Sequence, residues 1–208
     1  MLIKARHHKF FYPLFRYYAV WAIHRHFGRI EISGEFKDRN LPVLLIANHF
    51  SWWDGILAMY LNVNVIKRKF HFMMLEQQIR KFSYPNRVGG YSVQKGSRSI
   101  LESLKYTSEL LKNHKNMVLL FPQGKIESVY TTSFRFESGV GRIIANKGGQ
   151  VQILFAANLI NYFSDRRPGL YFYFAEYTGD KFDSSSLQEA YNLFFKDSIN
   201  ENALKSNN

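Results

Sequence analysis

The sequence contains no cysteine and no long uncharged hydrophobic run. Without cysteine there can be no disulfide, no thiolate metal site and no cysteine nucleophile, although the redox compartment stays open. No uncharged apolar run reaches the roughly 18 residues that a membrane-spanning helix needs. The N-terminus also lacks the pattern of a signal peptide. Four basic residues interrupt it: Lys4, Arg6, Lys9 and Arg16.

Acidic residues are scarce compared with basic ones. The 208 residues include 28 Lys and Arg but only 16 Asp and Glu, which gives a formal net charge of +12. This excess predicts an anionic partner, either nucleic acid or an acidic lipid surface. Because 46% of the residues are hydrophobic, a chain of this length can bury a sizeable core as one domain, with at most a small appendage.

The first hydrophobic segment, FFYPLFRYYAVWAIHRHF (residues 10–27), is apolar around most of a helical wheel. Lys9, Arg16 and His24 fall near one narrow polar line. The segment can be a helix packed on the domain, or an interfacial helix with its aromatic side chains among lipid headgroups. The aromatic content of 17% and the positive charge favour the second. We therefore expect residues 1–28 to form an interfacial helix on an anionic membrane surface, at the cytoplasmic face, as a peripheral or monotopic protein.

Strand-like and helix-like segments alternate along the rest of the chain. This alternation predicts an α/β fold with three layers, α/β/α, around a mostly parallel or mixed sheet. The main domain is expected over residues 29–200, followed by a polar tail over 201–208. The expected strands cover 29–34, 43–47, 70–75, part of 86–97, 117–121, 151–160 and 170–177. The expected helices cover 53–62, 76–82, Ser97 or Ser99 to about His114, 139–149 with a glycine stop, and Ser185 or Ser186 to about Ile199.

Ligands in such sheets bind beyond the carboxyl ends of the strands. The stretch ANHFSWWDG (47–55) follows one apolar strand and presents His49 and Asp54, which are costly to bury without partners. If Asp54 folds back from the first turn of a helix, it can fix the tautomer of His49 and stabilise the imidazolium. Such a pair suits a general base that deprotonates a substrate hydroxyl. Ser51, the one hydroxyl within the stretch, can be a nucleophile or a helix cap.

A second polar loop, 122–128, follows the strand MVLLF. Gly124 allows the backbone to approach a ligand closely, and Lys125 adds a positive charge. A plain turn punctuated by Pro122 and Gly124 is the alternative.

Together the two loops resemble a known family. NHFSWWD resembles the NHx4D motif of the glycerolipid and lysophospholipid acyltransferases, of the bacterial 1-acylglycerol-3-phosphate acyltransferase type. FPQGKIES, some seventy residues later, resembles the FPEGTRS motif of that family. GGYSVQK and ESGVGRIIANKGGQVQILF resemble the segments that lie between and after these motifs. The resemblance spans roughly residues 40 to 160, and the ordered pair is more specific than either motif alone.

The resemblance implies transfer of an acyl group from a thioester of acyl-carrier protein or coenzyme A to the hydroxyl of a lipid acceptor. It implies that His49 is the catalytic base, that Asp54 orients it and that Asn48 supports the turn. It implies no acyl-enzyme, no metal and no redox cofactor. The residues that it places along the acceptor and thioester site are Phe121, Pro122, Gln123 and Gly124.

Several positions depart from the family pattern. Gln123 stands where the family has glutamate, and Ile126, which can bind no phosphate, stands where it has arginine. A second arginine is replaced by Lys95, a point charge without the bidentate fork. Lys125, Lys95 and Arg135 together are one possible replacement for the anion site. An acceptor other than lysophosphatidic acid, such as a lyso-aminolipid or a glycosylated lipid, is the other reading.

Two further functions compete with acyl transfer. A nucleic-acid binder fits the charge and the aromatic content, but the basic residues are dispersed and no recognition motif is present. A non-catalytic lipid-binding relative is disfavoured by the intact His49 and Asp54. The remaining N-terminal histidines have no carboxylate or cysteine cluster beside them, so we expect surface or interfacial positions for His7, His8, His24 and His26. The sequence thus favours a membrane-associated O-acyltransferase without a nucleic-acid partner.

Overall fold

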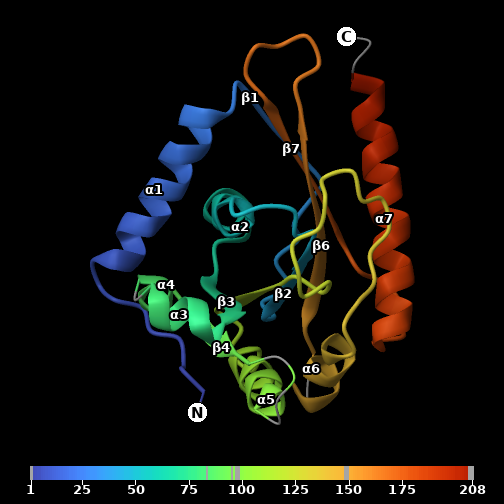
Figure 1. Ribbon diagram of the computed structural model, residues 1–208. Helices are drawn as coiled ribbons and strands as arrows, with labels where there is room; N and C mark the ends of the chain where they lie inside the picture. The colour runs from blue at the N-terminus through green and yellow to red at the C-terminus, as the bar shows by residue number, and fades with distance from the viewer. Residues whose placement is uncertain (1, 83, 95, 97–98, 148–149, 206–208) are drawn as a thin grey trace.

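The computed structural model describes residues 2–82, 84–94, 96, 99–147 and 150–205. In this part of the chain, seven strands form one sheet in the order β1-β7-β6-β2-β5-β3-β4 (Figure 1). The strands are β1 Arg29–Ser33, β2 Val43–Ala47, β3 Lys69–Leu75, β4 Gly90–Val93, β5 Asn116–Leu120, β6 Gln152–Asn161 and β7 Gly169–Glu176.

The helices alternate with these strands along the chain, as the sequence predicts. They are α1 Phe11–His26, α2 Asp54–Leu61, α3 Glu76–Lys81, α4 Tyr84–Arg87, α5 Ile100–Leu110, α6 Gly139–Lys147 and α7 Ser184–Leu204. A π-helical turn, η1 (Asn62–Ile66), continues α2 and ends at Lys67, which adopts the left-handed conformation.

The sheet is mixed. β6, β2, β5, β3 and β4 are parallel neighbours, whereas β7 runs antiparallel to β6. β1 pairs parallel with β7. The predicted mostly parallel or mixed sheet is therefore confirmed, and its antiparallel part lies at one end.

Helices cover both faces of the sheet, and this explains why the sequence of β2 is apolar at every position. Val43 and Leu45 pack in a core with residues of α1 and α2, while Leu44 and Ile46 pack in a second core with α5, α6 and α7. Figure 1 shows α1 and α2 on one side of the sheet and α7 on the other. A strand buried on both faces needs a continuous hydrophobic run. The expected three layers are present.

Helix α1 has one side packed on the domain and one side exposed. One side packs on α2 and buries Ala19, Ala22 and Ile23. The other side leaves large apolar side chains exposed: Phe10 just before the helix, then Phe11, Leu14, Tyr17, Tyr18 and Trp21. Among the described residues, no helix is both long enough and apolar enough to cross a membrane.

The boundaries of two helices differ from the sequence prediction. α5 ends at Leu110, not near His114, its flanking Ser99 makes no side-chain cap, and Leu101 is half exposed instead of facing inward. Ser97 and the predicted glycine stop at 148–149 lie outside the described residues. α7 begins at Ser184 and not at the expected Ser185 or Ser186, because its N-cap is Asp183, whose carboxylate accepts hydrogen bonds from two backbone N–H groups of the first turn.

The C-terminal end of α7 also differs from expectation. The helix continues through Leu204, and Asn202 within it is buried. Residues 201–204 are therefore helical, although the sequence placed them in a polar tail. A local count of polar residues missed this because the helix is held by its packing on β6 and β7.

The histidine prediction is wrong for His7. The segment before α1 pairs with residues 86–92 through main-chain hydrogen bonds, and His7 forms an isolated antiparallel bridge with Val88. The His7 ring hydrogen-bonds the carbonyl of Phe70 through Nε2 at 2.8 Å. It also lies edge-on against the buried His71 ring, 4.7 Å between centroids. His8, His24 and His26 are exposed as expected.

Candidate active site

The candidate site lies where two neighbouring parallel strands end. β2 and β5 pair with Ile46 opposite Leu120. The segments that leave these strands, which begin at Asn48 and Phe121, therefore emerge side by side. This edge of the sheet is where open α/β folds bind ligands.

His49 and Asp54 form a hydrogen-bonded pair at this edge. Asp54 is the first residue of α2 and is fully buried. Its Oδ2 atom lies 2.6 Å from His49 Nδ1. The strand-to-helix turn between them brings the carboxylate back to the ring, as the sequence predicts.

The surroundings of Asp54 decide which ring nitrogen carries the hydrogen. Oδ2 also accepts the backbone N–H groups of Phe50 and Ser51, at 2.7 and 2.9 Å. A carboxylate that collects N–H donors in this way is an acceptor, so His49 Nδ1 donates to it. Nε2 is then left with its lone pair, and no described residue hydrogen-bonds this atom. The arrangement prepares Nε2 to take a proton.

Ser51 is fully engaged in the turn. Its hydroxyl donates to Asp54 Oδ1 at 3.1 Å and accepts the backbone N–H of Trp53 at 3.0 Å. These contacts are those of a residue that organises the start of a helix. The N-cap position of α2 is Trp53, which makes no side-chain cap, so Ser51 stabilises the turn before the helix and is not the cap that the sequence left open.

The second loop contacts both the ring and the backbone of His49. The Phe121 ring stacks on the His49 ring with centroids 4.1 Å apart and planes 9° apart. The backbone N–H of Glu127 donates to the carbonyl of His49 at 2.9 Å. The loop between them turns at Gly124, whose φ of 64° favours glycine. Two segments distant in sequence therefore fix the position of one imidazole.

The geometry can be compared with known proteins at this point. The profile of the Acyltransferase family matches residues 29–155, which is more than half of the chain and contains both loops. The chain belongs to the acyltransferase family. No curated protein matches it. Membership of this family supports acyl transfer, as the resemblance implied.

The acyltransferase structure brings most of the predicted site residues together. His49 contacts both Asp54 and Phe121. Pro122 and Gln123, which follow Phe121 in the chain, are buried, and the Pro122 carbonyl accepts the backbone N–H of Glu137 at 2.8 Å. This contact anchors the loop to the segment that leads to α6.

Other predicted residues lie differently. The Asn48 amide is bound to the backbone of Asn158 in β6, donating to its carbonyl at 3.0 Å and accepting its N–H at 2.9 Å. Its amide therefore ties the residue after β2 to β6, next to the turn that it was expected to support. Ile126 and Arg135 are exposed. Lys95 lies outside the described residues.

Two residues of the candidate site were missed by sequence reasoning. Asn158 holds Asn48, and the only local signal was one asparagine within the apolar run LFAANLI. Glu127 joins its backbone to His49 and its carboxylate to Lys125, with Lys125 Nζ 3.2 Å from Oε1. Its signal was a second charge two residues after Lys125.

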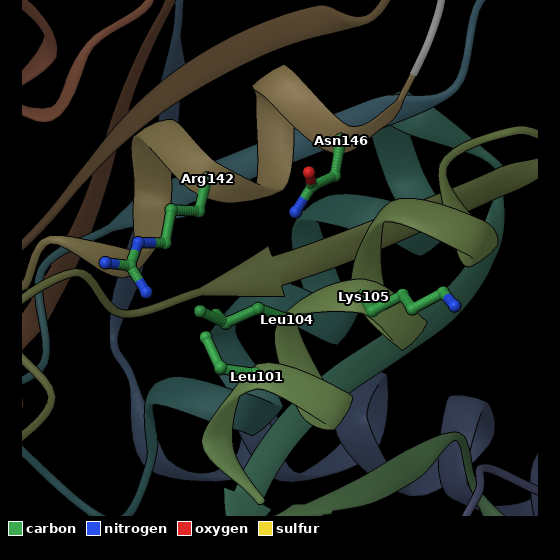
Figure 2. A pocket seen from close by; sticks show the side chains of 5 residues that line it. All are labelled: Leu101, Leu104, Lys105, Arg142 and Asn146. Carbon is green, nitrogen blue, oxygen red and sulfur yellow. The ribbon is translucent and has the colours of Figure 1, made fainter. Parts of the chain in front are cut away.

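A separate pocket of about 380 Å³ lies between α5 and α6 (Figure 2). Leu101 and Leu104 from α5 line it, with Lys105 from α5 and Arg142 and Asn146 from α6. None of these residues belongs to the loops that carry His49 or Gln123. The pocket therefore lies apart from the candidate site.

Proposed function

We propose that this protein transfers a fatty acyl group from an acyl thioester, carried by acyl-carrier protein or coenzyme A, to the hydroxyl of a lysophospholipid-like acceptor. The observation that carries the proposal is the His49–Asp54 pair, with Nε2 open, at the carboxyl edge of an acyltransferase-family sheet. The proposal involves no resident metal or redox cofactor.

In the proposed reaction, His49 Nε2 takes the proton of the acceptor hydroxyl as its oxygen attacks the thioester carbonyl carbon. The tetrahedral intermediate then collapses, the carbon–sulfur bond breaks, and the departing thiolate takes the proton back from the imidazolium. The Asp54 carboxylate stabilises that imidazolium between the two steps. The products are an ester and a free thiol, so no covalent enzyme intermediate is formed.

The proposed place of reaction is an anionic membrane surface at the cytoplasmic face, to which the protein binds as a peripheral or monotopic protein. The exposed apolar side of α1 and the net charge of +12 support this. Apolar and aromatic side chains on a basic protein suit the boundary between headgroups and acyl chains. A lipid acceptor would be met there, and nucleic acid is not a proposed partner.

The test is release of free thiol from an acyl thioester in the presence of vesicles and lipid acceptors. His49→Ala should lower the rate by about 100- to 10,000-fold, as expected when a general base is removed. The matched control is His114→Ala, because His114 is exposed and outside the site. If purified His49→Ala kept near-normal turnover while folded, the proposed mechanism would be wrong.

A further inference from the structure

The loop beside His49 contains three buried polar atoms that no described residue satisfies. They are Nε2 and Oε1 of Gln123 and Oε2 of Glu127. Gln123 is only 4% exposed. Buried polar atoms nearly always have hydrogen-bond partners, and each exception calls for a specific explanation.

Both side chains belong to the segment that fixes His49. Gln123 lies two residues after Phe121, which stacks on the imidazole. Glu127 donates its backbone N–H to the His49 carbonyl. A substrate that reaches Nε2 of His49 therefore approaches the same short loop that carries the unsatisfied atoms of Gln123 and Glu127.

The chemistry of these atoms selects the ligand. Oε1 of Gln123 and Oε2 of Glu127 are acceptors, so they require hydrogen-bond donors. Nε2 of Gln123 is a donor that any oxygen can satisfy. An ionised phosphate offers acceptor oxygens and negative charge, and it would face the Glu127 carboxylate. A hydroxyl or an ammonium group offers the donors that the two oxygens lack.

Lys125 does not reverse this preference. Its ammonium is paired with Glu127 Oε1 at 3.2 Å, and its side chain is 71% exposed. The neighbouring Ile126 has no hydrogen-bonding atom in its side chain. The loop therefore supplies one lysine that is already paired with a carboxylate.

We propose that Glu127 and Gln123 bind the polar end of the acceptor through its own hydrogen-bond donors, so that the acceptor carries a hydroxyl or ammonium group where lysophosphatidic acid carries phosphate. This inference rests on the proposed function and specifies its acceptor. Glu127 and Gln123 are then specificity-determining residues of the same site.

The experiment uses a matched series of oleyl glycerol ethers. All of them have one free hydroxyl on the middle carbon, and the third carbon carries phosphate, hydroxyl or ammonium. The full-length protein is assayed on vesicles with one acyl thioester, and the ester product is identified by its alkaline lability. We expect kcat/KM for the hydroxyl or the ammonium ether to exceed that for the phosphate ether by about tenfold or more.

Variants at Glu127 separate the two sources of donors. Whether the preferred group is hydroxyl or ammonium, Glu127→Ala should lower the ratio of kcat/KM for the preferred ether to kcat/KM for the phosphate ether about tenfold. Glu127→Gln keeps an acceptor oxygen but removes the charge, so it should lower kcat/KM for the ammonium ether and leave kcat/KM for the hydroxyl ether close to the wild-type value. Glu137→Ala, which removes an exposed carboxylate from the segment that leads to α6, should leave the ratio unchanged.

Two results would overturn the inference. One is a wild-type preference for the phosphate ether. The other is an equal loss with all three ethers in a folded Glu127→Ala protein, which would make the residue merely structural. The wild-type series decides the question even if a variant fails to fold. Absence of His49-dependent thiol release with every acceptor would overturn the proposed function itself, and the inference with it.

Discussion

Asp54 accepts four hydrogen bonds in the turn around His49, three from N–H groups and one from the Ser51 hydroxyl. Asp54→Asn replaces one acceptor oxygen by an NH₂ group, which then faces these donors, and it removes the charge that stabilises imidazolium. We expect kcat/KM to fall by on the order of 100-fold or more. We also expect a loss of about 1–3 kcal/mol in the free energy of unfolding, because a buried donor loses its acceptor. Activity within a few fold of wild type would contradict this role.

Ser51 gives a second prediction at the scale of single residues. Because its hydroxyl is used to organise the turn, Ser51→Ala should cost about 1 kcal/mol in stability. It should leave most of the activity. Mass spectrometry of the protein quenched during turnover should find no acyl group on Ser51. An acyl-Ser51 intermediate that disappears in the alanine variant would show a nucleophilic serine, and the direct transfer proposed above would be wrong.

At the scale of elements, α1 carries the proposed membrane contact. It also contributes Ala19 and Ile23 to the core, so deleting it would confuse binding with folding. A point substitution is cleaner: Leu14 is 60% exposed on α1, and Leu193 is 60% exposed on α7. Leu14→Glu should weaken co-sedimentation with anionic vesicles by about tenfold or more, because it loses apolar burial and adds repulsion.

The matched control for α1 is Leu193→Glu, which makes the same chemical change at the same exposure on another helix. It should bind vesicles like the wild-type protein. If both variants bound vesicles as strongly as the wild-type protein, with unchanged circular dichroism, α1 would not be part of the membrane contact. Equal loss in both would point to net charge alone.

At the scale of the whole molecule, the contact between the N-terminal segment and the sheet makes stability depend on pH. Burial, together with the nearby His7, lowers the pKa of His71 to about 3. Burial and the charge of Lys69 also lower the pKa of His7, whose ring contacts Tyr12 as well. Both rings are therefore harder to protonate in the folded protein than in the unfolded chain, where they take up a proton near pH 6.5.

The sign of the pH effect follows from this difference. Below pH 6.5 the unfolded chain binds more protons than the folded protein. The contribution of the neutral rings to the free energy of unfolding is therefore fully present above that pH and is lost as the pH drops toward 3. Between about pH 7.5 and 5.5, His71 should account for a loss of about 1.4 kcal/mol, and His7 for a smaller amount. Denaturant titrations should show this slope in wild type and a weaker one in His71→Phe. An unchanged slope in that variant would disprove the assignment.

Local patterns predicted much of this fold, because the responsible interactions are local. The run VLLIA indicated a buried strand, and the spacing of His49 and Asp54 indicated a turn that brings them together. Long-range partners were not predictable in this way. Nothing near His7 shows that its ring will contact His71 across the sheet edge.

The same limit applies to the site. The family resemblance named Gln123 and Lys125 by position, but whether a polar atom is satisfied depends on the whole surroundings. Only the structure shows that Gln123 is buried without partners and that Lys125 is paired with Glu127. Similarly, α7 was expected to end early because its last turns are polar, yet Asn202 is buried there, with a hydrogen-bond contact to Tyr173.

The three tryptophans of the sequence are Trp21, Trp52 and Trp53. Trp21 lies on the exposed side of α1, and the other two lie in the turn between His49 and Asp54. Trp53 also contacts His26, the last residue of α1, with ring centroids 4.9 Å apart. The tryptophan fluorescence of the protein therefore originates from α1, the proposed membrane contact, and from the turn between His49 and Asp54. With Trp21 replaced by phenylalanine, emission would report on the turn alone, so binding of vesicles and of acyl thioester could be followed separately without any attached dye.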